Sequence, residues 1–225
     1  MTRTALIIGC GDDTGAAIAR AFAREGLHVC LSRRPRHEDK LDTLAKEIHA
    51  SGGQATACPV DARDEDAVTA LFENIENNIG PLEVVIFNIG ANVRFSITET
   101  TSRVFRKVWE MATFAGFLTG REAAKHMLPR ERGTIIFTGA TASVRGSSGF
   151  AAFASAKFAL RALAQSMARE LGPKNIHVAH VVIDGAIDTN FIRDILPDVD
   201  AKRAQDAILN PDHVAANYVM LHNQP

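Results

Sequence analysis

The sequence has few cysteines and no long apolar run. Its 225 residues include three cysteines, Cys10, Cys30 and Cys58, and no CxxC pair. A small and odd number of cysteines argues against a disulfide framework and favours a reduced, cytoplasmic setting. No apolar run approaches the roughly 18 residues that a membrane helix needs. The N-terminal apolar run, Ala5–Ile8, is too short for a signal peptide. We therefore expect neither a leader nor a membrane segment.

The sequence also lacks an excess of charge and the common hydrolase and metal motifs. The 25 Lys and Arg residues nearly balance the 26 Asp and Glu residues, which argues against a nucleic-acid or anionic-membrane partner. There is no His-Glu-x-x-His pattern and no nucleophile-elbow serine. His177 and His180 are three residues apart in a predicted strand, so they point to opposite faces and cannot share a metal. We predict no metal site.

What the sequence does contain is a regular alternation of short apolar runs and helical patterns. Many of the runs are apolar almost throughout, which is typical of strands covered on both faces. The predicted strands are Thr4–Ile8, His28–Ser32, Ala55–Val60, Leu82–Phe87, Thr134–Thr138 and His177–Ile183, and the helical patterns cover 15–25, 39–50, 64–78, 102–128 and 153–171. This order predicts a single α/β domain over residues 1–225, a doubly wound parallel sheet of the Rossmann type. Such a sheet binds its ligand outside the carboxyl ends of its strands.

A glycine-rich turn follows the first predicted strand. Gly9, Gly11 and Gly15 lie between a strand and a helix, where glycines permit a tight turn and let a pyrophosphate approach a helix N-terminus. The alternative is an ordinary helix entry with Asp12 or Asp13 as N-cap. Two carboxylates in such a loop would repel a phosphate unless their side chains point away from it. We favour nucleotide binding.

The end of the second predicted strand indicates which dinucleotide is bound. Folds that bind NAD usually place an acid here for the ribose diol, whereas the 2′-phosphate of NADP favours arginine. Here Ser32 is followed by Arg33 and Arg34. The pattern favours NADP, with NAD still possible, and a solvated basic turn is the alternative. Asp61, after the third strand, could accept a hydrogen bond from an adenine amino group.

Together these motifs resemble the short-chain dehydrogenase/reductase family over essentially the whole chain. The family's glycine turn is matched at Gly9 and Gly15, with Asp13 in place of the middle glycine. Its N-N-A-G element appears as "FNIG", and its P-G-x-x-x-T turn as "DGAIDT". The resemblance implies the strand order 3-2-1-4-5-6. Together with the turn chemistry it indicates these cofactor-binding residues: Gly9, Gly11, Asp12, Thr14, Gly15, Ser32, Arg33, Asp61, Ala62, Asn88, Gly90, Lys157, Gly185, Ile187 and Thr189.

The same resemblance implies an unusual catalytic site. The family's Y-x-x-x-K motif falls on "FASAK", so Lys157 would bind the nicotinamide ribose while Phe153 replaces the catalytic tyrosine. The serine and asparagine positions fall on Ala140 and Ala112. The alternative for Lys157 is an aliphatic stem on the core with its ammonium in water. Thr138, Thr141 and Ser143 flank Ala140 and could supply a displaced hydroxyl.

Two functions remain open at this point. The first is an oxidoreductase that transfers hydride between NADP(H) and a small carbonyl or alcohol substrate. The second is a catalytically inactive nucleotide-binding sensor or scaffold, which the loss of three polar groups favours. A lid over about 190–210 is expected, with a helix near 191–196. A homo-oligomer, a dimer or a tetramer, is also expected, and a dimer would form through the long helical segments 102–128 and 153–171.

Overall fold

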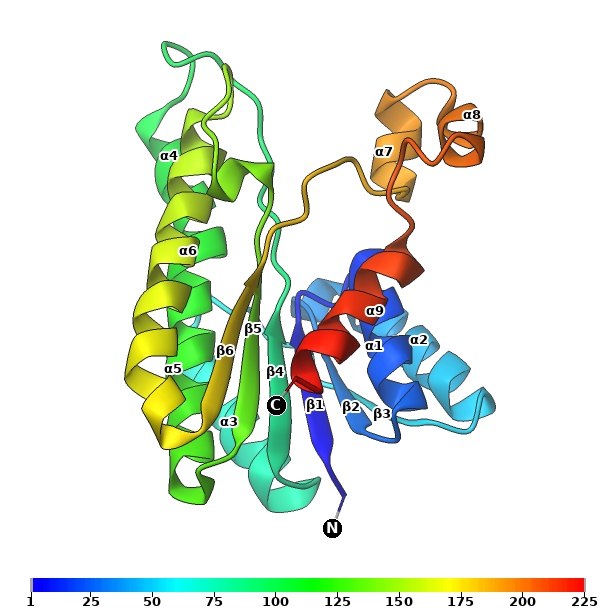
Figure 1. Cartoon of the computed structure of the whole chain (residues 1–225), viewed down its shortest axis with the longest axis vertical. Coiled ribbons are helices and arrows are strands. Elements are labelled where there is room, and N and C mark those ends of the chain that lie inside the picture. The colour runs from blue at the N-terminus through cyan, green and yellow to red at the C-terminus, as the bar shows by residue number, and fades with distance from the viewer. Residues whose placement is uncertain (1, 225) are drawn as a thin grey trace.

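The computed structural model describes residues 2–224, without the side chains of Phe191 and Ile195, so the predicted domain limits at 1 and 225 lie outside the described residues. Its centre is one parallel six-stranded sheet in the order β3-β2-β1-β4-β5-β6 (Figure 1). The strands are β1 (Thr4–Ile8), β2 (His28–Ser32), β3 (Gln54–Ala57), β4 (Leu82–Phe87), β5 (Gly133–Thr138) and β6 (Ile176–Val181). The predicted fold class and strand order are confirmed.

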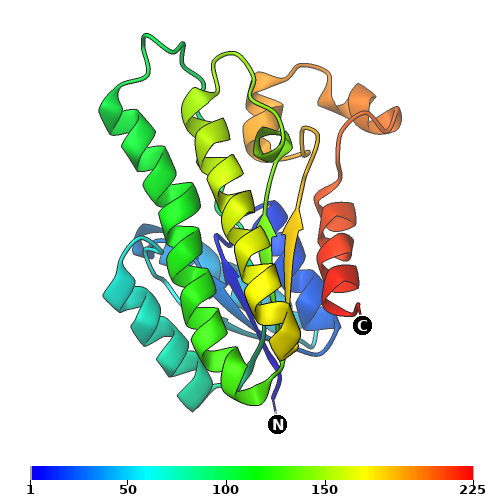
Figure 2. The ribbon, with the colours of Figure 1, turned by 60° about the vertical axis from the view of Figure 1, so that its left-hand side comes forward.

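Helices cover both faces of the sheet because the central strands are apolar on both sides. In β1, Ala5 and Ile7 face one core while Leu6 and Ile8 face the other, as the two-residue period of a strand requires. The first core is closed by α1 (Thr14–Arg24), α2 (Glu38–Ala50) and α9 (Pro211–His222). The second is closed by α3 (Glu65–Asn78), α5 (Ala115–Met127) and α6 (Ala151–Leu171) (Figures 1 and 2).

Several predicted boundaries differ from the structure by one to three residues, and one predicted helix is divided. The third strand ends at Ala57 rather than Val60, although the N–H groups of Cys58 and Val60 still donate to the carbonyl oxygens of Leu31 and Arg33. The last strand ends at Val181 rather than Ile183. The predicted helix over 102–128 is α4 (Ser102–Trp109) and α5, joined by a π-helical turn over Glu110–Phe114.

The C-terminal part of the chain contains a helix that the sequence analysis did not predict. In α9, Ala215 and Tyr218 are fully buried against α1 and the sheet, and the Tyr218 hydroxyl lies 2.7 Å from Thr138 Oγ1. The helix expected near 191–196 is α7 (Asn190–Ile195), followed by α8 (Val199–Ala204). Both lie beyond the carboxyl ends of the strands (Figure 1).

Short 3₁₀ turns complete the described elements, at Pro35–His37, Leu128–Arg130, Thr141–Ser143 and Gly172–Lys174. Within residues 2–224, every helix is too short or too polar to cross a lipid bilayer.

Candidate functional site

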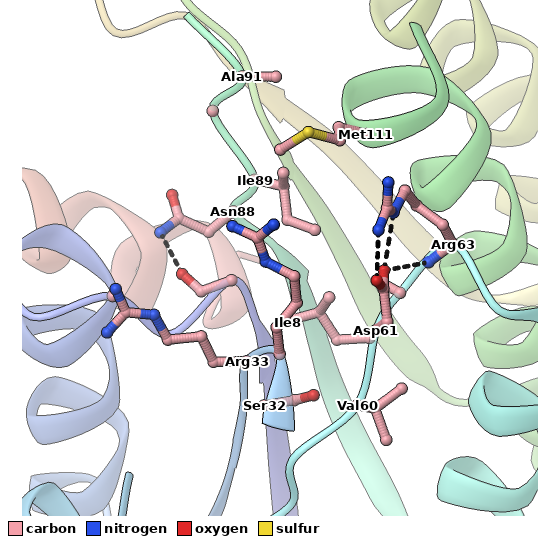
Figure 3. Close-up of a pocket in the computed structure, with 15 residues that line it drawn as sticks. Ile8, Ser32, Arg33, Val60, Asp61, Arg63, Asn88, Ile89, Ala91 and Met111 are labelled. Carbon is pink, nitrogen blue, oxygen red and sulfur yellow. Dashed lines mark hydrogen bonds and ion pairs between the residues drawn. The ribbon is translucent and has the colours of Figure 1, made fainter. Parts of the chain in front are cut away.

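A cavity of about 220 Å³ opens at the carboxyl ends of β1, β2 and β4 (Figure 3). It brings together eight of the residues that the sequence assigned to the cofactor: Gly9, Gly11, Ser32, Arg33, Asp61, Ala62, Asn88 and Gly90. The other assigned positions do not line it: Asp12, Thr14, Gly15, Lys157, Gly185, Ile187 and Thr189. The cavity therefore lies where a doubly wound sheet presents its ligand site.

The glycines of this site serve two different purposes. A Cβ on Gly9, which has φ +89°, would lie 2.6 Å from the Asn88 carbonyl oxygen, and one on Gly15 would lie 2.7 Å from the Cα of Cys10. The protein's own backbone therefore requires these two glycines. A Cβ on Gly11 or Gly90 would meet nothing within 4 Å among the described residues. Both line the cavity, so their missing side chains leave room for a ligand to approach the backbone.

The glycine turn leads into the N-terminus of α1, which begins at Thr14. Asp13 occupies the N-cap position, and its side chain caps no amide of the helix among the described residues. Its carboxylate instead accepts a 3.4 Å hydrogen bond from the backbone N–H of Asn190. Asp12 also turns away, toward Arg33. The helix N-terminus thus keeps its capacity to bind an anion despite two neighbouring carboxylates.

Two arginines after β2 give the cavity a positive wall. Arg33 NH1 donates to Asp12 Oδ1 at 2.7 Å, while Arg34 forms no ion pair within residues 2–224. Partial burial and the nearby charge of Arg36 lower the pKa of the Arg34 guanidinium. This end of the cavity therefore has positive charge available for an anion.

On the opposite wall, Asp61 is held by Arg63 (Figure 3). The Asp61 carboxylate accepts from Arg63 Nε at 2.9 Å, from Arg63 NH2 at 2.5 Å and from the Arg63 backbone N–H at 3.2 Å. The Arg63 guanidinium holds the pKa of Asp61 below its usual value. A carboxylate has about four lone-pair positions, so one remains for a ligand donor.

Lys157 is only 2% exposed and contacts the cavity-lining residue Ile89 without lining the cavity itself. Its Nζ donates to the carbonyl oxygens of Ile89, two residues after β4, at 2.9 Å and of Thr138, the last residue of β5, at 2.8 Å. The alternative that its ammonium lies in water is therefore wrong. Burial lowers the pKa of Lys157 to about 7. An ammonium has three donors, so one remains for a bound molecule.

The residue one turn before Lys157 is packed in apolar surroundings. Phe153 is 8% exposed and contacts Ala140 and Ala142 in a small apolar cluster. The Lys157 Nζ is 6.0 Å from the centroid of the Phe153 ring, so the two side chains share a face as the helical spacing predicts. Ala112, in the π-helical turn, is completely buried between α4 and α6.

Comparison with known proteins decides the family. A family model described as "short chain dehydrogenase" matches residues 3–200. The chain belongs to this family. Versicolorin reductase stcU of Emericella nidulans is 33% identical over 190 residues, which are 84% of this chain and 70% of that protein.

Solved structures agree with this assignment. A short-chain dehydrogenase from Rhodopseudomonas palustris has 53% sequence identity and a TM-score of 0.84, over 99% of this chain and 92% of that one. An actinorhodin polyketide ketoreductase, solved with NADPH, has a TM-score of 0.88 at 23% identity, over 99% of this chain and 90% of that one. The second likeness is one of fold.

The three hydroxyls near Ala140 have different hydrogen-bond partners in this chain. Thr138 Oγ1 is buried against Tyr218, and the buried Ser143 Oγ accepts from the Ala140 N–H at 3.1 Å. Only Thr141 lies toward solvent, where its hydroxyl donates to Asp184 Oδ1 at 2.5 Å. Of the three hydroxyls that could replace the serine, Thr141 is therefore the accessible one, and it is paired with a carboxylate.

The turn after β6 lies apart from the cavity. Ile187 forms a bridge with Leu209, and a Cβ on Gly185 would lie 3.2 Å from a methyl of Leu209. Thr189 caps α7 by accepting from the Ile192 N–H at 3.2 Å. These contacts position the segment that leads into α7.

Seven lining residues were not among the cofactor-binding residues that the sequence indicated: Ile8, Arg34, Val60, Arg63, Ile89, Ala91 and Met111. All but Met111 adjoin or nearly adjoin residues that the sequence did assign, and the Asp-x-Arg spacing could have indicated the ion pair at Asp61. Met111 comes from the distant π-helical turn, and nothing in the local sequence marks it.

Proposed function

We propose that this chain transfers hydride between NADP(H) and a small carbonyl or alcohol substrate. The observation that supports this best is the cavity itself, where the glycine turn, the Ser32-Arg33-Arg34 segment and Asp61 line one hollow. The glycine turn and α1 would hold the pyrophosphate, and Asp61 would face the adenine. The nicotinamide supplies the hydride when it is bound. A titration with NADPH and NADH, followed by a turnover assay on a panel of carbonyl compounds, tests the proposal.

The proposed preference for NADP rests on the arginines after β2. Ser32 is small and buried, so this position lacks the acidic side chain with which NAD-binding folds usually bind the ribose diol. Arg33 and Arg34 both line the cavity, and a guanidinium suits a phosphate in charge and geometry. NAD remains the alternative cofactor under this proposal.

Replacing Arg33 tests this preference. We expect Arg33→Ala to weaken NADPH binding by about tenfold, because a hydrogen bond to a charged group contributes about 1.5 kcal/mol at its lower end. NADH binding should change little. Isothermal titration calorimetry measures both. Arg36→Ala is the matched control, since Arg36 is exposed in the same segment and does not line the cavity. The proposed preference for NADP is contradicted if Arg33→Ala weakens the binding of NADPH and NADH equally. It is also contradicted if the parent protein binds both with equal affinity.

A catalytically inactive nucleotide-binding sensor or scaffold is the second candidate. The apolar packing of Phe153 against Ala140 favours it, since neither side chain can carry a proton. In the catalytic alternative the Thr141–Asp184 pair is the accessible proton-bearing group beside Ala140. The turnover assay separates the two candidates. Removing a general acid typically lowers a rate by about 10²–10⁴-fold, so a catalytic chain without another acid should be slow.

We also propose that the chain forms a homo-oligomer through the outer surface of α4, α5 and α6. The continuous α4–α5 segment runs beside α6 (Figure 2), and these helices carry four aromatic side chains that are 40–42% exposed: Phe105, Trp109, Phe117 and Phe158. Trp109, Phe114 and Phe117 stack in sequence, with ring centroids 6.0 and 6.2 Å apart. Exposed aromatic side chains gathered on one face are typical of protein interfaces.

A charge placed on this surface tests the oligomer. We expect Phe117→Glu to convert the dimer or tetramer into single subunits, because an ionised carboxylate is costly to bury in an apolar interface. Size-exclusion chromatography with light scattering measures the mass. Met220→Glu is the control, since Met220 is an exposed apolar residue on α9. A parent protein that is already a single subunit would contradict the proposal.

We also propose a lid over the substrate and a cytoplasmic location. Residues 190–210, which form α7 and α8 beyond the carboxyl ends of the strands, would cover the substrate as a lid. A cytoplasmic location is proposed from the three cysteines, all of them free and buried.

A further inference from the structure

Asp12 occupies an unexpected place for a carboxylate in a phosphate-binding turn. Its Oδ1 accepts from Arg33 NH1 at 2.7 Å and its Oδ2 from Lys40 Nζ at 2.6 Å, so each oxygen is paired with one cation. Partial burial by itself would raise the pKa of Asp12, but the hydrogen bond from Lys40 and the charge of Arg33 outweigh it and lower the pKa. Asp12 is therefore ionised at neutral pH.

The Asp12 carboxylate thus occupies the place beside Arg33 and Lys40 where these two cations would otherwise bind an anion. Arg33 lines the cavity described above, whereas Asp12 and Lys40 line a neighbouring hollow of about 280 Å³ between α1 and α2. Gly11 lines both hollows, and its missing side chain leaves the space between them open. An anion that approached Arg33 along this turn would meet the Asp12 carboxylate first.

We propose that Asp12 is a specificity-determining residue that competes with the 2′-phosphate of NADP(H) for Arg33 and Lys40; this inference rests on the proposed function. A 2′-phosphate carries about −1.5 to −2 charges at neutral pH. It must displace the carboxylate from the two cations and tolerate its repulsion. NADH has an uncharged 2′-hydroxyl, which can donate to a carboxylate. Asp12 therefore reduces the difference in affinity between NADPH and NADH that Arg33 would otherwise produce.

The test removes the charge and keeps the shape. In Asp12→Asn, the affinity for NADPH should rise at least about tenfold relative to the affinity for NADH, because a charge-assisted competitor is lost. The fragments 2′,5′-ADP and 5′-AMP, which differ only in the 2′-phosphate, should show the same change. In Asp12→Asn combined with Arg33→Ala, the gain should largely disappear, since one of the two cations that Asp12 restrains is gone. Calorimetry measures all four ligands.

Asp13→Asn is the matched control, because it removes the same charge at the next residue. Within residues 2–224, the side chain of Asp13 forms no ion pair with Arg33 or Lys40. Its ratio of NADPH to NADH affinity should equal that of the parent. The proposal is overturned if Asp12→Asn leaves this ratio unchanged, or if Asp13→Asn raises it equally. If no variant binds either nucleotide, while circular dichroism shows all of them folded, the proposed function itself is wrong and the role of Asp12 falls with it.

Discussion

Phe153→Tyr combined with Ala140→Ser is expected to raise NADPH-dependent reduction of small ketones by at least about 100-fold. Phe153 and Lys157 share a face of α6, with the Lys157 Nζ 6.0 Å from the ring centroid. A tyrosine at this position would have a depressed pKa, because the neighbouring ammonium favours the phenolate. That is the property that a general acid and base needs near neutral pH.

The structure indicates that the pocket can accept both changes. Tyrosine has nearly the shape of phenylalanine, and serine adds one oxygen to Ala140, which packs against Phe153 and is only partly buried. Ala112→Asn, which would restore the asparagine of the family's catalytic residues, is expected to be less well tolerated. Ala112 is completely buried among Val108, Ala152 and Ala156. An amide there would be buried among apolar side chains, which costs about 1–3 kcal/mol if it finds no partner.

The measurement is NADPH consumption on a panel of ketones by the parent and the double variant. Phe158→Tyr serves as the control, because it adds the same hydroxyl to an exposed position of α6. A parent that turns over briskly and is slowed by the double change would show that another acid operates. If parent and double variant both bind NADPH but neither reduces any ketone, the prediction fails and the non-catalytic candidate gains support.

The second large effect is expected at Lys157, in the dependence of stability on pH. Its ammonium is buried, and this burial lowers the pKa to about 7 in the folded protein, whereas an unfolded lysine keeps a pKa of about 10.4. Between these values the unfolded chain binds one more proton than the folded one. The free energy of unfolding therefore rises with pH in this window. Below about pH 7 both states are charged, and the cost of burying the charge is fully present.

Lys157→Met should remove this dependence while keeping the apolar stem. We expect the parent to gain about 2 kcal/mol more unfolding free energy than the variant between about pH 7 and pH 9. Urea denaturation at both pH values measures the difference. The neighbouring His180, whose pKa burial lowers to about 4, does not titrate in this window. If the free energies of unfolding of the parent and the variant depend equally on pH, the lowered pKa of the buried Lys157 is contradicted.

The same variant separates a binding role from a structural one. If the third donor of Lys157 contacts the cofactor, Lys157→Met should weaken the binding of NADPH and NADH while circular dichroism shows an intact fold. The two carbonyls that Lys157 now satisfies belong to Ile89 and Thr138. A variant that is folded and binds both nucleotides like the parent would restrict Lys157 to joining the backbone of the segment after β4 to the end of β5.

The sequence by itself determined the sheet, because the strands and most of the helices that cover it are encoded by short-range patterns. Alternate residues of β1 belong to opposite cores. A strand that is buried on both faces requires apolar residues at successive positions, and this run is visible in the sequence. The glycine turn was predictable for a related reason: Gly9 and Gly15 meet the backbone of Asn88 and Cys10 so closely that only glycine fits. The demand at Gly15 is local, because Cys10 is five residues away, whereas the demand at Gly9 comes from Asn88, which is distant in sequence.

The tertiary structure decided what the polar side chains do, because their partners come from elsewhere in the fold. Asp12 is paired with Arg33 and Lys40, which are 21 and 28 residues away in sequence, and its orientation changes a repulsive carboxylate into the partner of two cations. For Lys157 the sequence favoured a ligand and left water as the alternative, and only the fold places its ammonium against the carbonyl oxygens of Ile89 and Thr138. Electrostatic free energy depends on burial and on distance, and a linear pattern specifies neither for residues that meet only when the sheet has formed.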